Sequence, residues 1–227
     1  MNNQAKLTLN PLAKLHQYQH QSTQQQNDST LQEQRQLTII LSSDITLEHF
    51  KIGQGAKVSC PKDCVIKLED NQNTLVLFNY EVKSGIWAFT ATCRKVKYGN
   101  GIGIIDAKQN GFSHPFDSNN SRDNNTICLI GQTPYIKGKS KLGPGCNELQ
   151  QSEEVRVIVD LQSNPHTFCL VINKVLQPFC VMNIQDRVKF ILLFGGKDDE
   201  WEFISLEELA QGVDLNKIEQ RRRYKYE

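Results

Sequence analysis

The chain has 227 residues, of which 38% are hydrophobic and 22% charged, and its formal net charge is +1 at pH 7. This length is enough for one full domain with tails, or for two small domains. A net charge so close to zero produces no global field that would attract nucleic acid or a membrane surface, so neither is expected as a partner.

The lack of a recognisable targeting signal and the cysteine usage both favour a cytoplasmic protein. No apolar run approaches the roughly 18 residues that a membrane-spanning helix needs, and the first residues lack the apolar region of a secretory signal. The seven cysteines are an odd number, and several stand inside apolar strand-like runs, where a free thiol behaves as a small hydrophobe. We therefore expect reduced thiols without a disulfide framework, and no cofactor.

Residues 1–36 differ in composition from the rest of the chain. Ten of them are glutamine, and asparagine, serine and histidine fill much of the remainder. Such a tract has too little apolar surface to offset the loss of chain entropy, which predicts a disordered or tethering tail. A short leucine stripe within it fits either a transient helix or a docking motif for a partner groove; its members are Leu7, Leu9, Leu12 and Leu15.

The next segment begins the predicted sandwich. Residues 37–41 are β-rich and predict an edge strand, and Ser42, Ser43 and Asp44 either cap a short helix or start a turn. Residues 107–125 form a long polar loop, which in a compact domain is usually functional or disordered. A second polar hairpin region covers residues 131–147.

Residues 153–206 are the most informative stretch of the chain. Apolar residues alternate with polar ones over 155–160, and three further short strands are predicted at 167–172, 188–194 and 201–204. Short β-branched and aromatic runs bounded by turn residues indicate an antiparallel sandwich or barrel. The fold class is therefore predicted to be all-β.

Helices are expected only after the last strand. Ser205 and the acidic residues behind it have the composition of a helix N-terminus, and Gly212 would end that helix. Residues 214–226 predict a second short helix that is basic at its end. The predicted division of the chain is a tail at 1–36, a sandwich at 37–206 and a helical basic extension at 207–227.

Several patterns that could carry chemistry have a simpler interpretation. Cys60 and Cys64 could supply two zinc ligands, but the His16 and His20 pair lies about forty residues away, so a turn with two ordinary thiols is preferred. Nothing places His114 or His166 beside a nucleophilic cysteine, so the chain is not expected to be an enzyme.

Four other clusters also favour structural roles. The glycines of residues 99–103 precede a strand instead of a helix, which predicts a turn and close sheet packing in place of a phosphate loop. The acidic residues 198–200 predict a solvated hairpin tip, and the arginines 221–223 a solvated helix end. Trp87 and Trp201 are expected in the core.

The chain resembles the B30.2/SPRY family in a series of short motifs. Residues 157–161 are similar to its strand that ends in V-x-V-D-L, and residues 168–174 to the following hairpin, with Asn173-Lys174 where Asn-Gly is commoner. Upstream, residues 65–75, 84–89 and 101–106 are similar to three earlier strands of the family in the same order. The resemblance covers roughly residues 55–206 and implies a SPRY-like, concanavalin-type jelly roll.

The resemblance also implies a binding surface. In that family the binding loops gather at one end of the sandwich and their sequences determine specificity. If the binding surface of the family is transferred to the matching positions of this chain, it would use the loop after Tyr80, the turn 97–100, the long loop after Asp106 and the region around Tyr135. The expected partner contacts are Tyr80, Lys97, Tyr98, Asn100, Asp106 and Tyr135, with the tyrosines as anchors.

Three functions remain open on the sequence. The preferred one is protein–protein interaction with a peptide or folded partner, which the resemblance extends to an adaptor of a ubiquitin ligase or a scaffold. The first alternative is a structural subunit of a large assembly, tethered by its tails. The second is a carbohydrate-binding jelly roll, for which the polar residues Asp117, Asn119, Asn120 and Asp123 would be candidates. The sequence indicates neither the partner's identity nor the oligomeric state.

Overall fold

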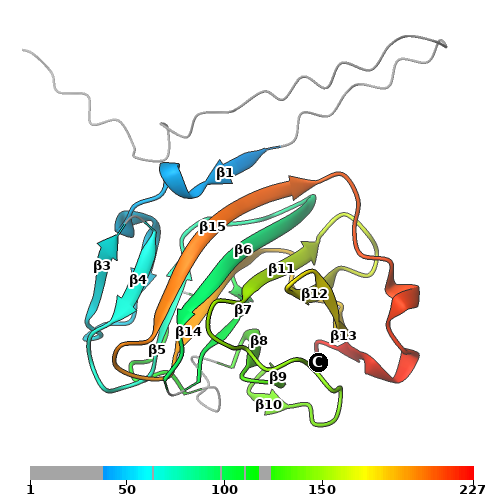
Figure 1. Cartoon of the computed structure of the whole chain (residues 1–227). Coiled ribbons are helices and arrows are strands. Elements are labelled where there is room, and N and C mark those ends of the chain that lie inside the picture. Colours follow the sequence, from blue (N-terminus) through cyan, green and yellow to red (C-terminus); the bar gives the residue numbers. More distant parts are fainter. Residues whose placement is uncertain (1–37, 63, 98, 110, 118–123) are drawn as a thin grey trace, which may run out of the picture.

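The computed structural model describes residues 38–62, 64–97, 99–109, 111–117 and 124–227, and its described part is built from two β-sheets (Figure 1). Both consist mainly of antiparallel pairs, so the predicted all-β sandwich is confirmed. The predicted tail at 1–36 and Tyr98 lie outside the described residues, and the predicted divisions at 36 and 206 stay predictions. No helix in the described part is long and apolar enough to cross a membrane.

Sheet A has nine strands in the order β16-β13-β12-β11-β6-β15-β4-β3, with β1 also paired to β15. The predicted edge strand is confirmed over β1, and Ser42–Asp44 form a single 3-10 turn. The strands are β1 (Ile39–Leu41), β3 (Val58–Lys62), β4 (Val65–Leu68), β6 (Ile86–Lys95), β11 (Glu154–Asp160), β12 (Thr167–Ile172), β13 (Val175–Met182), β15 (Glu200–Leu209) and β16 (Arg223–Lys225).

Sheet B has seven strands in the order β10-β9-β8-β7-β14-β5-β2. Its strands are β2 (Phe50–Ile52), β5 (Thr74–Phe78), β7 (Gly101–Asp106), β8 (Thr126–Ile130), β9 (Thr133–Ile136), β10 (Lys139–Ser140) and β14 (Val188–Phe194). Besides Ser42–Asp44, single 3-10 turns occur at Leu47–His49, Leu215–Lys217 and Gln220–Arg222.

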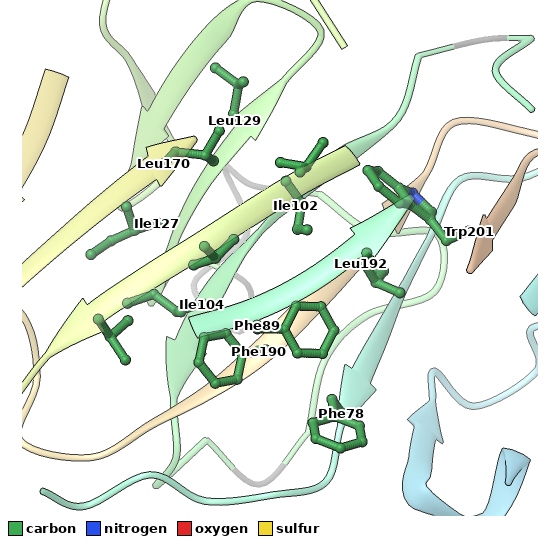
Figure 2. Close-up of a cluster of buried hydrophobic side chains, with 14 of the residues drawn as sticks. Phe78, Phe89, Ile102, Ile104, Ile127, Leu129, Leu170, Phe190, Leu192 and Trp201 are labelled. Carbon is green, nitrogen blue, oxygen red and sulfur yellow. The ribbon is translucent and has the colours of Figure 1, made fainter. Parts of the chain in front are cut away.

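The core lies between the inner faces of the two sheets (Figure 2). Phe89 of β6 stacks on Phe190 of β14 with ring centroids 4.9 Å apart, which joins sheet A to sheet B. Trp201 is fully buried and donates its indole N–H to the Leu193 carbonyl at 3.1 Å, and Trp87 is 8% exposed. Both tryptophans are therefore core residues, as predicted.

The predicted helix from Ser205 is wrong. β15 continues to Leu209 because β6 offers it a partner along the whole length, up to the pair Leu209↔Ile86. The acidic side chain of Glu207 accepts a hydrogen bond from Arg156 at 2.9 Å, so it serves a cross-strand ion pair instead of a helix N-terminus.

The C-terminal segment packs against sheet A. Its helical content is limited to the two 3-10 turns, and β16 then pairs in parallel with β13. Val213, Leu215 and Ile218 cover an apolar cluster on the outer face of sheet A. A continuous helix over 214–226 is therefore not present, because the chain instead follows the open edge of β13.

Candidate functional site

Three of the predicted contact residues, Lys97, Asn100 and Asp106, are divided between opposite ends of the sandwich. Within β7, Gly101 pairs with Leu193 and Asp106 with Val188, so the strand runs from one end of sheet B to the other. Lys97 and Asn100 precede β7, whereas Asp106 closes it, and a six-residue strand spans about 20 Å. Lys97 and Asp106 therefore belong to opposite ends of the sandwich, and the predicted set of partner contacts stays a prediction.

Asn100 is a structural residue. Its side chain is fully buried and its amide nitrogen lies 3.2 Å from both the Cys93 sulfur and the Lys95 carbonyl oxygen. This burial removes the Asn100 side chain from the set that a partner can contact in this conformation. The backbone N–H of Lys97 donates to Asp199 at 2.6 Å, while the Lys97 side chain is exposed.

The two described tyrosines of the predicted set are half-buried. The ring of Tyr80 packs beside Trp87, with centroids 5.6 Å apart, and burial raises the pKa of its hydroxyl, with a smaller contribution from Glu208. Tyr135 packs against an apolar cluster on the outer face of sheet B. Each ring therefore has a packing role, and their roles as partner anchors stay predictions.

The described residues 107–109 and 111–117 cross the outer face of sheet B, and we call them the strap. The side chains of Phe112 and Phe116 pack on that face, and the Phe116 N–H donates to the Asn73 carbonyl at 3.2 Å. His114 lies 3.2 Å from the Thr74 hydroxyl and 3.4 Å from an Asp70 carboxylate oxygen. The strap thus runs from the Asp106 end of β7 to the start of β5 at the opposite end.

The strap was not predicted as an ordered cover, although the sequence carries a signal for it. Both faces of β5 are apolar, because Leu75 and Leu77 point outward while Val76 and Phe78 point into the core. A strand that is apolar on both faces requires a cover on each. Phe112 and Phe116 are the apolar residues in the polar loop that supply this cover.

A groove of about 670 Å³ lies between the strap and β2, and we call it the strap groove. Its apolar part consists of Ile52 and Phe112. Its polar part has two lysines and two amides, from Lys51, Gln54, Lys108 and Gln109. Mixed linings of this kind are typical of sites that anchor an apolar side chain and orient it with polar groups.

The strap groove is basic. No carboxylate of the described residues lies within ion-pair distance of Lys51 or Lys108. Lys189 lies close to Lys51 and donates to the Asn79 side-chain oxygen at 2.9 Å. Burial lowers the pKa of Lys189, and the charge of Lys51 lowers it further, against the opposing effect of Glu81. An acidic ligand group would relieve this repulsion between the two ammonium groups.

The other clusters singled out in the sequence have structural contacts. His166 lies 3.5 Å from Asp186, and the described residues contain no group of three metal-ligating side chains. Gly99 has φ +106° in the loop before β7, and Gly101 and Gly103 allow the predicted close packing of β7 against β8. His16, His20, Asn119, Asn120 and Asp123 lie outside the described residues.

Two charge clusters differ from the prediction of solvated ends. Asp199 is fully buried and accepts hydrogen bonds from backbone N–H groups, so residues 198–200 are not simply a solvated tip. Arg222 donates to the Pro144 carbonyl at 2.7 Å and Arg223 to the Ile218 carbonyl at 3.0 Å. Arg222 therefore ties the C-terminal segment to the sandwich, whereas the Arg223 hydrogen bond lies within that segment.

Comparisons with known proteins bear on the fold. No family model matches the sequence, and no curated protein matches it significantly. Among solved structures, the SPRY domain of human HERC1 is similar with a TM-score of 0.51 and 11% identity, over 74% of this chain and 99% of that one. This likeness shows a SPRY-like fold, so the predicted fold class is confirmed.

Two further solved structures are similar at lower scores. The carbohydrate recognition domain of Emp46p has a TM-score of 0.46 and 12% identity, over 74% of this chain and 90% of that one. Arcelin-5, a lectin-like defense protein from Phaseolus vulgaris, has a TM-score of 0.47 and 12% identity, over 75% and 96% of the two chains.

Proposed function

We propose that this chain is a protein–protein interaction module that binds an acidic peptide segment in the strap groove. The observation that carries the proposal is the groove itself, which combines an apolar floor at Ile52 and Phe112 with the ammonium groups of Lys51 and Lys108, and these have no carboxylate of the described residues within ion-pair distance. A segment with one apolar side chain beside one or two carboxylates fits this lining. The adaptor role in a ubiquitin ligase stays a prediction within this proposal.

The location of the groove supports recognition of an extended segment. β2 is the last strand of sheet B, and it is only three residues long. The strap faces it across the groove, so one wall comes from a strand of sheet B and the other from a loop. A sheet that holds a variable loop in place is a common design for recognition sites.

Charge reversal in the groove is the test of this function. A randomised peptide library displayed on phage is selected on the immobilised full chain, and the enriched peptides are expected to pair an apolar residue with Asp or Glu. The double variant Lys51→Glu plus Lys108→Glu is expected to bind those peptides at least about fourfold more weakly, because two attractions become repulsions at roughly 0.2–1 kcal/mol per exposed charge pair. Isothermal titration at two salt concentrations measures the change.

The matched control keeps the overall charge change the same. Lys139 and Lys217 are exposed and lie away from the groove, so Lys139→Glu plus Lys217→Glu is expected to change the Kd by less than about twofold. Equal losses in the two double variants, or enriched peptides without acidic residues, would contradict the proposal.

A further inference from the structure

Two cysteines face each other on neighbouring strands of sheet A. Cys169 of β12 and Cys180 of β13 are paired in the antiparallel register, just before the register shifts. Both belong to the apolar cluster on the outer face, where Ile218 lies over them. The register places their side chains next to each other, and each thiol shifts the pKa of the other.

The hydrogen-bond pattern fixes the type of pair. Asn173 donates its backbone N–H to the Glu154 carbonyl at 2.9 Å, and this contact continues the β11–β12 register in which Ile158 faces Cys169. Backbone groups alternate sides along a strand, so Cys169, four residues before Asn173, also points its N–H and C=O towards β11. Cys169 and Cys180 therefore form a non-hydrogen-bonded pair, in which the side chains of the two strands approach most closely.

This pairing meets the geometric requirement for a disulfide. Cα atoms in a non-hydrogen-bonded antiparallel pair lie about 4.5 Å apart, inside the range of about 4.4–6.8 Å found for disulfides. The two strands are already paired, so the bond needs no large backbone movement. The cross-link would lie on the outer face, outside the packed core between the sheets.

The remaining environment distinguishes Cys180 from three other buried thiols of the chain. The hydrogen bond from Cys169 lowers the pKa of Cys180, against burial, and the charge of Arg223 lowers it further. Burial instead raises the pKa of Cys93 and of Cys128 to about 12, and that of Cys146 to about 11. A thiolate is the reactive form of cysteine, so Cys180 is the better nucleophile among these four.

We propose that Cys169 and Cys180 are a site of reversible disulfide formation by hydrogen peroxide. The Cys180 thiolate attacks one peroxide oxygen, the O–O bond breaks, and the leaving hydroxide takes a proton to become water. The Cys169 thiol then attacks the sulfenic sulfur of Cys180, the S–S bond forms, and the second oxygen leaves as water with the thiol proton. Two thiols are oxidised to one disulfide while one peroxide is reduced to two waters.

Access to the pair is controlled by the C-terminal segment. Cys169 is 1% exposed and Cys180 is 0% exposed, beneath Ile218 at 1%. Two hydrogen bonds lie within this cover. The Asn216 backbone N–H donates to the Asp214 carboxylate, and the Arg223 side chain donates to the Ile218 carbonyl. Peroxide reaches the sulfurs when residues 213–218 move away from sheet A, so the rate of oxidation reports that opening.

The site is tested on the full chain by thiol counting and mass spectrometry. The reduced protein is treated with hydrogen peroxide and then alkylated. We expect the loss of two thiols per chain, a cross-linked peptide pair that contains Cys169 and Cys180 and has lost two hydrogen atoms, and full recovery of both thiols with a reductant. A peptide pair that joins other cysteines, or persistent alkylation of both Cys169 and Cys180, would overturn the proposal.

Variants separate the pair and its cover. Cys180→Ser and Cys169→Ser are each expected to abolish the cross-link, and the wild-type peptide map decides the matter even where a variant folds poorly. Ile218→Ala is expected to raise the rate of cross-linking several-fold, because it thins the cover. Ile136→Ala, which removes a buried isoleucine from the core between the sheets, is the matched control and is expected to leave the rate nearly unchanged. An equal increase in both variants would assign the rate to general loosening and overturn the role of the cover.

Discussion

Replacement of Asp199 with asparagine is expected to lower the free energy of unfolding by about 2–4 kcal/mol, because a buried carboxylate loses hydrogen bonds of roughly 1.5–3 kcal/mol each. The Asp199 carboxylate accepts backbone N–H groups from Lys97 at 2.6 Å, from Gly195 at 2.9 Å and from Gly196 at 3.0 Å. An amide nitrogen in place of one oxygen faces at least one of these donors and cannot accept from it. Urea unfolding followed by tryptophan fluorescence measures the loss.

Asp198 provides the matched control for Asp199. Its side chain is 32% exposed and pairs with Lys67 at 3.1 Å, so Asp198→Asn removes only a surface ion pair. Such pairs contribute about 0–1 kcal/mol, and asparagine tolerates the positive φ of this residue, so the change in unfolding free energy is expected to stay under about 1 kcal/mol. Similar losses in the two variants would show that the Asp199 carboxylate does not anchor the backbone at Lys97, Gly195 and Gly196.

Gly103→Ala is expected to destabilise the protein by about 3 kcal/mol or more, because overpacking at a site that cannot relax exceeds the usual range of 1–3 kcal/mol. A Cβ atom on Gly103 would overlap the Ile127 carbonyl oxygen and lie 2.6 Å from the Cα of Cys128. Both obstacles belong to the backbone of β8, which is paired on either side and cannot shift without breaking sheet B. Differential scanning calorimetry is expected to show a strongly lowered Tm or no folding transition.

Gly111→Ala is the matched control for Gly103→Ala. A Cβ atom on Gly111 meets nothing within 4 Å among the described residues. The free energy of unfolding is therefore expected to change by no more than about 0.5 kcal/mol. A comparable Tm loss in the two variants would mean that β7 and β8 do not approach each other as closely as described.

Much of the sandwich could be predicted from local pattern. The alternation at 155–160 and the turn at Asn173-Lys174 each match a strand or a hairpin of the structure, and both turn residues have positive φ. The end of β15 could not be predicted, because Ser205 followed by acidic residues has the local composition of a helix N-terminus. Whether these residues form a strand or a helix is decided by pairing with β6, which is distant in sequence.

The binding surface was harder to predict than the fold. Sequence motifs indicate which residues lie in loops, but the strand register decides at which end of the sandwich each loop emerges. Lys97 and Asp106 are near in sequence and separated by the full length of β7, so loops that neighbour each other along the chain open on opposite ends. The strap could not be recognised as an ordered cover because most of its residues are polar. Phe112 and Phe116 are the apolar residues that pack it on sheet B.

The order of strands in sheet A has a consequence for synthesis on the ribosome. β6 lies between β11 and β15, and Arg94 of β6 meets Glu202 of β15 across 108 positions of sequence. When β6 leaves the ribosome, neither of its neighbours has been made, and β1 also waits for β15. The nascent chain therefore carries unpaired apolar strands until β15 emerges. Chaperones protect such strand edges during this period, and contacts between residues that are distant in sequence form slowly.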